Sequence, residues 1–123
     1  MVEGKKVLIV DDELEFTQMI LTFLKSQKFE AYAANNLEEA INIFKREKPK
    51  VVLLDVNMPI VNGDKFLPVL RSLNPSIQVI VISGFSKEDI DGRFKPTEYF
   101  AFFKKGDFLL EDLSKTIEKA CLA

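Results

Sequence analysis

The side chains best suited to chemistry in this 123-residue chain are polar residues that directly follow short apolar runs. They are Asp11, Asp12, Asp55, Ser83 and the pair Lys104–Lys105. Neighbouring carboxylates repel one another and raise one another's pKa unless a cation offsets their charge. Oxygen ligands suit Mg²⁺, which binds a few carboxylates, keeps several waters and takes phosphate oxygens. A hydroxyl and an ammonium beside that ion would suit the other oxygens of a phosphoryl group.

This chemistry leaves two kinds of site open. A carboxylate beside Mg²⁺ can act as a nucleophile, accept a phosphoryl group and become an acyl phosphate. The same set of ligands could instead belong to a Mg²⁺-dependent phosphatase. Both kinds require that side chains far apart in the sequence meet at one place in the fold.

The apolar run Val51–Leu54 positions the most informative of these acids, Asp55. A short continuous apolar run after a turn signal is typical of a strand buried on both faces, as in a parallel sheet. Asp55 then falls where the strand leaves the sheet, and ligands of open α/β sheets bind at that edge. Strand interiors disfavour aspartate and buried charge is costly, so a functional interpretation of Asp55 is favoured.

Four further segments predict strands, namely Lys6–Val10, Ala31–Ala34, Ile77–Ile82 and Phe100–Phe103. With short connections through helices, five strands predict a doubly wound, mostly parallel α/β sheet with helices on both faces. The strongest apolar runs should be central, which gives the flavodoxin-like order 2-1-3-4-5. In this arrangement all of the polar residues named above gather at one edge of the sheet.

The segments between the strands carry apolar residues at helical spacing. The buried stripe of the first is predicted to be Phe16, Met19, Ile20, Phe23 and Leu24. Asn36, with Glu39 three residues later, predicts a helix N-terminal cap. Later helices are predicted from Ala40, Ile41 and Phe44, from Phe66, Leu67 and Leu70, from Lys87–Arg93, and from Leu109, Leu113 and Ile117. Pro68 leaves the start of its helix open.

Composition narrows the function classes. The length predicts a single domain over residues 1–123, and a net charge of -2 gives no reason to expect nucleic-acid or anionic-membrane binding. No apolar run approaches transmembrane length, and the single Cys121 fits a reducing cytoplasm. The chain has no histidine, which excludes Ser-His-Asp catalysis, His-ligated zinc and a histidine phosphocarrier within it.

The polar residues, in this order and spacing, resemble the receiver domain of two-component response regulators, of the stand-alone single-domain type. The shared motifs are Asp11-Asp12-Glu13, Leu54-Asp55 followed by Asn57-Met58-Pro59 and Gly63, Ser83-Gly84, and a lysine after the fifth strand. The resemblance covers essentially the whole chain. Its motifs are jointly specific.

The resemblance implies that Asp55 accepts a phosphoryl group from a phosphohistidine on a sensor histidine kinase or histidine phosphotransfer protein. Asp11 and Asp12 would hold Mg²⁺ together with Asp55 and the backbone carbonyl of Asn57. Ser83 and the lysine would contact the phosphoryl oxygens. A downstream protein would read the state of the domain on the face made by the fourth helix, the fifth strand and the last helix.

The lysine itself is the main departure from the family pattern. The family usually has proline after this lysine, often in a cis peptide, whereas this chain has Lys104-Lys105-Gly106. The spacing from Ser83 and the aromatic pattern favour Lys105 as the phosphate lysine and Phe102 as the switch aromatic. Lys104, with Ala101 at the aromatic position, is the alternative. Glycine in place of proline predicts a more flexible loop.

The sequence therefore predicts a phosphorylation-controlled signalling switch, not a metabolic enzyme, with slow self-phosphorylation and self-dephosphorylation as its only chemistry. It would act by binding partners, or it is a receiver cut from a longer protein. The alternatives are a Mg²⁺-dependent phosphohydrolase on a related α/β fold and a degenerate receiver that serves as a docking module. For individual residues, Asp12 and Glu13 could also be no more than caps of the helix that follows them.

Overall fold

The computed structural model describes residues 5–55, 63–84, 88 and 99–123 of the chain. The strands are β1 (Lys6–Val10), β2 (Glu30–Ala34), β3 (Val51–Leu54), β4 (Gln78–Ser83) and β5 (Ala101–Lys104). They form one sheet in the order β2-β1-β3-β4-β5, and every neighbouring pair is parallel. The predicted fold class and strand order are confirmed, with the weaker second and fifth strands at the edges.

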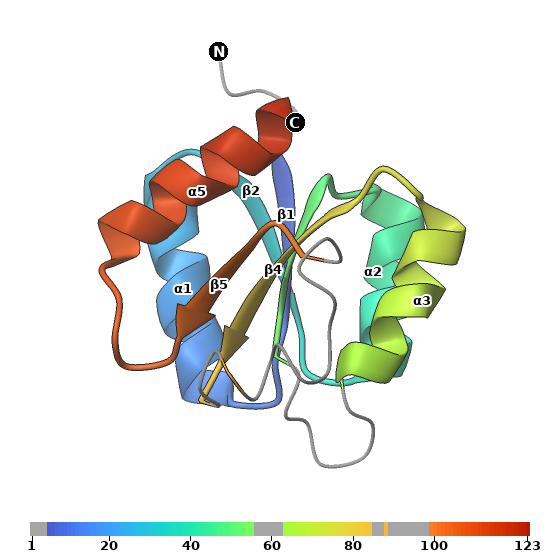
Figure 1. Ribbon diagram of the computed structural model, residues 1–123, viewed down its shortest axis with the longest axis horizontal. Helices are drawn as coiled ribbons and strands as arrows, with labels where there is room; N and C mark the ends of the chain where they lie inside the picture. The colour runs from blue at the N-terminus through green and yellow to red at the C-terminus, as the bar shows by residue number, and fades with distance from the viewer. Residues whose placement is uncertain (1–4, 56–62, 85–87, 89–98) are drawn as a thin grey trace.

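Helices cover both faces of this sheet, as Figure 1 shows, with α1 and α5 on one side and α2 and α3 on the other. Their bounds are α1 Leu14–Ser26, α2 Leu37–Glu47, α3 Gly63–Leu73 and α5 Leu110–Leu122. Except for Glu88, the helix predicted over Lys87–Arg93 lies outside the described residues. None of the helices in the described part of the chain is long and apolar enough to cross a membrane.

Alternation along the strands divides the buried side chains into two cores. The core under α2 and α3 takes Leu8, Val10, Val52, Leu54, Val79 and Val81 from the sheet. The core under α1 and α5 takes Val7, Ile9, Val51, Leu53, Ile80 and Ile82. On β5, Phe102 packs against the first core and the adjacent Phe103 against the second, so the two rings lie on opposite faces of the sheet.

Two of the predicted helix stripes need correction. In α1 the buried residues are Thr17, Ile20 and Leu24, whereas Met19 is 48% exposed. Thr17 can take a core position because its hydroxyl donates to the carbonyl oxygen of Leu14 over 2.9 Å, which satisfies its hydrogen bond locally. Leu109 is 67% exposed because it is the N-cap residue of α5 and not part of its buried stripe.

The predictions for α2 and α3 agree with the structure. The Asn36 side chain accepts a hydrogen bond from the backbone N–H of Glu39 at 2.8 Å, which caps α2. Phe66, Leu67 and Leu70 are all buried on α3. This helix begins at Gly63, so Pro68 lies inside it and not at its start. The Pro68 side chain is exposed to solvent. On α2, Ile43 is buried as well, a core position that the sequence stripe left out.

Candidate functional site

The carboxyl ends of four neighbouring strands meet at one edge of the sheet. In the register of the sheet Val10 is level with Leu54, and Leu54 with Val81, so the residues that follow β1 and β3 lie side by side. The backbone N–H of Asp55 donates to the carbonyl oxygen of Val10 over 3.0 Å. On the other side of β3, the backbone N–H of Lys105 donates to the carbonyl oxygen of Ser83 over 2.9 Å.

Three carboxylates form a compact cluster at this edge. One ligand oxygen from each of Asp11, Asp12 and Asp55 lies within 4.8 Å of the others. Asp11 and Asp55 are buried, at 1% and 4% exposure, and Asp12 is half-buried. Side chains two positions apart on a strand point to the same face of the sheet. Asp11 comes two residues after Ile9 and Asp55 two residues after Leu53, so both acids lie on the face covered by α1 and α5.

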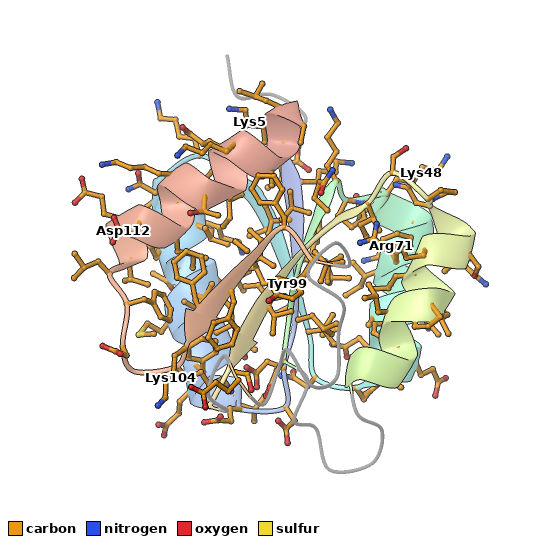
Figure 2. The ribbon with its side chains drawn as sticks, in the orientation of Figure 1. Lys5, Lys48, Arg71, Tyr99, Lys104 and Asp112 are labelled. Atoms are coloured by element: carbon orange, nitrogen blue, oxygen red, sulfur yellow. The ribbon has the colours of Figure 1, made fainter. Side chains whose placement is uncertain are left out.

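Lys105 places its ammonium against these carboxylates. Its Nζ lies 2.8 Å from Asp11 Oδ2, 3.2 Å from Asp55 Oδ2 and 2.5 Å from Glu13 Oε1. Lys105 continues the side of β5 that carries Phe103, which faces α1, and the Lys105 side chain is only 14% exposed. Lys104 is exposed at the end of β5, where Figure 2 labels it. The geometry at the acids therefore favours Lys105 over Lys104.

Two groups of this cluster, Asp11 and Lys105, have raised pKa values. The pKa of Asp11 is raised to about 6, mainly because the carboxyl is buried and to a smaller extent because the Asp55 charge lies nearby. Hydrogen bonds from Lys105 and from the backbone N–H of Glu13 act in the opposite direction and lower this pKa. Burial also works to lower the pKa of Lys105. Its bonds to Asp11 and Glu13 and the charge of Asp55 outweigh that effect, so the pKa of Lys105 is raised. The ammonium thus stays charged, and the buried acid has more negative charge around it than one lysine neutralises.

The family model of the response regulator receiver domain matches residues 7–118, from the second residue of β1 into α5, and this range includes Asp11, Asp12, Asp55 and Lys105. The chain belongs to this family. Receiver domains of this family are signalling switches in two-component systems, and the membership does not favour the phosphohydrolase or docking-module alternatives.

Individual relatives agree with this assignment. The chain is 31% identical over 115 residues to the regulatory protein AtoC of Escherichia coli, covering 94% of this chain and 25% of AtoC. It is 33% identical to the chemotaxis protein CheY of Thermotoga maritima over 69% of this chain and 72% of that protein. The solved structure of CheY4 from Vibrio cholerae superposes with a TM-score of 0.84 at 26% identity, covering 94% of this chain and 97% of that one. The chain thus spans about a quarter of AtoC but most of the two chemotaxis proteins.

The acids of this receiver domain fit a divalent cation. Asp11 Oδ2 is buried and pairs with the Lys105 ammonium at 2.8 Å, but the same ammonium also pairs with Asp55 and Glu13. One ammonium cannot neutralise the three clustered carboxylates, and buried carboxylate charge is costly unless a further cation compensates it. The donors are all carboxylate oxygens, which suit Mg²⁺ better than softer metals. The cluster could therefore hold such an ion.

The other predicted site residues are placed less completely. Ser83 is fully buried at the end of β4, beside the acids in sheet order. Phe102 is half-buried and packs against the core under α2 and α3. Asn57 lies outside the described residues. Gly106, where the family usually has proline, has a φ of +78°, a left-handed conformation that proline cannot adopt.

Sequence reasoning missed the contacts that Asn35 and Phe16 make at the site. The Asn35 side chain donates to the carbonyl oxygen of Asp11 over 2.8 Å and ties the loop after β1 to the loop after β2. The Lys105 Nζ lies 4.7 Å from the centroid of the Phe16 ring, a cation–π distance. A short polar residue after the second strand was the available signal for Asn35. The pairing of Phe16 with Lys105 has no local sequence signal.

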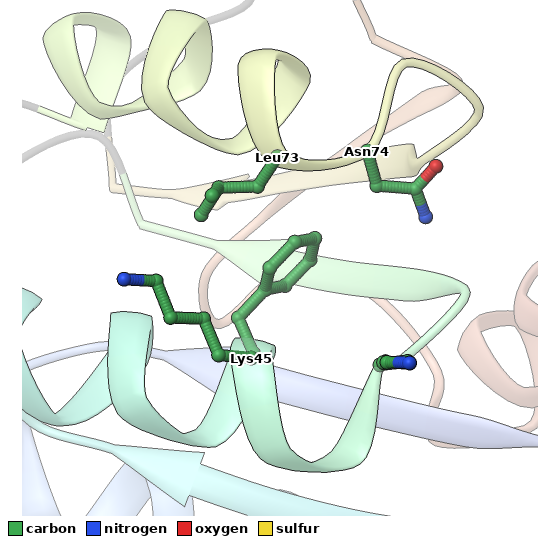
Figure 3. Close-up of a pocket in the computed structure, with 5 residues that line it drawn as sticks. Lys45, Leu73 and Asn74 are labelled. Atoms are coloured by element: carbon green, nitrogen blue, oxygen red, sulfur yellow. The ribbon is translucent and has the colours of Figure 1, made fainter.

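A separate hollow of about 280 Å³ lies between α2 and α3, lined by Phe44, Lys45, Lys48, Leu73 and Asn74 (Figure 3). Its lining residues Lys48 and Asn74 come before the strands β3 and β4 begin, whereas Asp55 and Ser83 stand where these strands end. The hollow is therefore at the amino ends of these strands, whereas the acids are at the carboxyl ends, and it takes no part in their chemistry.

Proposed function

We propose that Asp55 is the phosphoacceptor of this receiver domain and that a phosphoryl group on it controls the binding of a protein partner. The observation that carries the proposal is the cluster of Asp11, Asp12 and Asp55, in which Asp11 and Asp55 pair with the Lys105 ammonium. Asp55 stands at the end of the central strand β3, in the middle of this arrangement.

In the proposed reaction a carboxylate oxygen of Asp55 attacks the phosphorus of a phosphohistidine. A P–O bond forms, the P–N bond breaks and the imidazole leaves with its electron pair. Hydrolysis reverses the modification, because water attacks the phosphorus and the P–O bond to Asp55 breaks, which restores the carboxylate and releases inorganic phosphate. We expect no chemistry on any other substrate.

Mg²⁺ would be held by Asp11, Asp12 and Asp55, with the backbone carbonyl of Asn57 as a further ligand. When bound, it would neutralise charge on the transferring phosphoryl oxygens. Lys105 would supply a second positive charge from the β5 side of the site. Ser83 would offer its hydroxyl to another phosphoryl oxygen. In this scheme each phosphoryl oxygen meets a group at the end of a strand, which a rigid sheet holds in place.

The donor is proposed to be a sensor histidine kinase or a histidine phosphotransfer protein, since the chain has no histidine of its own. One region of the sensor kinase/phosphatase LuxN of Vibrio harveyi is 33% identical to this chain over 104 residues, so related domains occur within such kinases. We further propose that the whole of residues 1–123 is one receiver domain, located in the cytoplasm and without nucleic-acid or membrane partners. Its output surface would include β5 and α5.

Intact mass after incubation with Mg²⁺ and acetyl phosphate or phosphoramidate tests the phosphoacceptor. One phosphoryl adduct, stable in acid and labile in base, is expected for the unchanged chain and for Asp112→Asn, a control at an exposed acid of α5. Asp55→Asn and Asp55→Ala should show none. An adduct retained in either Asp55 variant would place the nucleophile elsewhere.

A further inference from the structure

The Glu13 side chain has a position that neither the metal site nor its helix explains. Glu13 is the N-cap residue of α1, yet its side chain makes no capping hydrogen bond. Its Oε1 instead lies 2.5 Å from the Lys105 Nζ, across 92 residues of sequence. The ring of Phe16, one turn further along α1, lies 4.7 Å from the same ammonium. Glu13 and Phe16 therefore form a seat for Lys105 beside the acid cluster.

The Lys105 ammonium and a bound divalent cation would compete for the same carboxylates. Nζ lies 2.8 Å from Asp11 Oδ2 and 3.2 Å from Asp55 Oδ2, and both carboxylates belong to the cluster that could hold a metal ion. Two cations on one carboxylate repel each other strongly in a buried site. When a metal ion occupies the cluster, the ammonium must give up at least part of these two contacts.

We propose that Glu13 is a positioning residue that keeps the Lys105 ammonium at the site while Mg²⁺ occupies the carboxylates. Among the ion-pair partners of Lys105 in the described part of the chain, Glu13 is the acid outside the cluster. The face of the Phe16 ring adds attraction for the ammonium at the same spot. The inference rests on the proposed function, because it requires Mg²⁺ at Asp11, Asp12 and Asp55.

Retention of the lysine matters because its side chain is long and flexible. Ordering a free lysine side chain is entropically costly. An ammonium that is paired with Glu13 stays close to Asp55 and needs only a short movement to reach a phosphoryl oxygen there. The Glu13 side chain is 63% exposed, and exposed ion pairs add little to the stability of a fold. Its contribution is therefore to the location of Lys105 and not to folding.

The side-chain resonances of Lys105, in protein labelled at lysine, report this location. Protons above an aromatic ring shift upfield, so Phe16→Leu measures how much of the Lys105 Hε shift comes from the seat. Without Mg²⁺, the unchanged chain and Glu13→Gln should both show the upfield shift, because Asp11 and Asp55 still hold the ammonium. At saturating Mg²⁺ the unchanged chain should keep most of the shift and Glu13→Gln should lose it. Glu15→Gln, which removes the same charge from an exposed position in the first turn of α1, should behave as the unchanged chain.

Backbone amide shifts of Asp11 and Asp12 in the same samples show whether Mg²⁺ binds. If they move and Lys105 then responds alike in the unchanged chain and in Glu13→Gln, the role of Glu13 is overturned while the proposed function stands. Loss of Mg²⁺ binding in Glu13→Gln alone would make Glu13 a metal ligand and also overturn the inference. If Mg²⁺ moves no amide in the unchanged chain, the metal site and the inference both fail. If Phe16→Leu does not change the Lys105 Hε shift, the ammonium does not lie over the Phe16 ring, and the inference is overturned.

Discussion

The backbone N–H of Lys105 donates to the carbonyl oxygen of Ser83 over 2.9 Å, so the proposed phosphate lysine and the proposed switch serine are tied together across β4 and β5. In the register of the sheet, Ser83 is level with Lys104, the residue before Lys105. Because side chains alternate along β5, Lys104 and Lys105 point to opposite faces, and the Lys105 side chain points toward α1 and the acids. It is the structural basis for the first prediction.

Lys105→Ala should blunt the response of the domain to beryllofluoride, a phosphoryl mimic, whereas Lys104→Ala should leave it intact. Lys105 alone of the two pairs with Asp11 and Asp55, and Lys104 is exposed. Amide chemical shifts of residues 99–112, with and without the mimic in Mg²⁺, measure the response. A response lost in Lys104→Ala and kept in Lys105→Ala would shift the assignment of β5 by one residue.

Asp12→Ala should weaken Mg²⁺ binding most among the acid variants and should also stabilise the metal-free protein. Asp12 is the most exposed of the three clustered acids, so its side chain can leave without a buried cavity, while carboxylate repulsion falls. Titration calorimetry with Mg²⁺ and urea unfolding in EDTA measure the two effects. Unchanged Mg²⁺ affinity would reduce Asp12 to a helix cap.

Asp11→Asn should stabilise the metal-free domain at neutral pH but not at pH 4. The pKa of Asp11 is raised from 3.8 to about 6, so the folded state holds a proton between these values that the unfolded state has lost. By linkage the unchanged chain loses stability as pH rises from about 4 to about 6, by on the order of 2 kcal/mol, and asparagine does not. Urea unfolding in EDTA at pH 4 and pH 7.5 checks this. An equal difference between the two proteins at both values would remove titration of Asp11 as the cause.

Much of the fold was predictable because its signals are local. Apolar runs identify β1, β3 and β4, and their strength orders the central strands. Asn36 identifies the start of α2 through one side-chain bond. Hydrophobicity alone could not predict that Thr17 is buried in α1 while Met19 is exposed. The buried position of Thr17 depends on the hydrogen bond that its hydroxyl donates to the carbonyl oxygen of Leu14 in the same helical turn.

The site was predictable in part for the same reason. The acids follow strands, and parallel strands end together. The spacing from Ser83 and the aromatic pattern favoured Lys105 over Lys104, and the ion pairs of Lys105 with Asp11 and Asp55 support that choice. The contact between Glu13 and Lys105 could not be predicted, because the two residues are 92 positions apart and the local sequence offers a helix cap as a sufficient explanation of Glu13.

Asn36→Ala should cost about 1 kcal/mol of stability, because the backbone N–H of Glu39 loses its acceptor at the start of α2. Asn42→Ala, at an exposed interior position of the same helix, should be neutral or slightly stabilising, since alanine has the higher helix propensity. Urea unfolding of both variants measures the difference. Equal effects of the two substitutions would show that the cap contributes nothing.

Ser83→Ala should still allow phosphorylation of Asp55 but should weaken the change on β5. In the alternation of β4, Ser83 continues the side that carries Val79 and Val81, and Phe102 packs against that same core. Ser83 and Phe102 therefore lie on one side of the sheet, on adjacent strands. A hydroxyl that moves to meet a phosphoryl oxygen leaves space on this side, and we expect the half-buried Phe102 ring to turn into it.

Intact mass gives the extent of phosphorylation of Ser83→Ala, and the aromatic resonances of Phe102 with and without beryllofluoride give the change on β5. Ser114→Ala on α5 is the matched control, because it removes a buried hydroxyl on the other side of the sheet. We expect the adduct in both variants and a full Phe102 response only in the control. If Phe102 responds fully in Ser83→Ala, the ring is not coupled to the serine. Lys105, whose backbone is bonded directly to β4, would then be the next residue to test as the link between the site and β5.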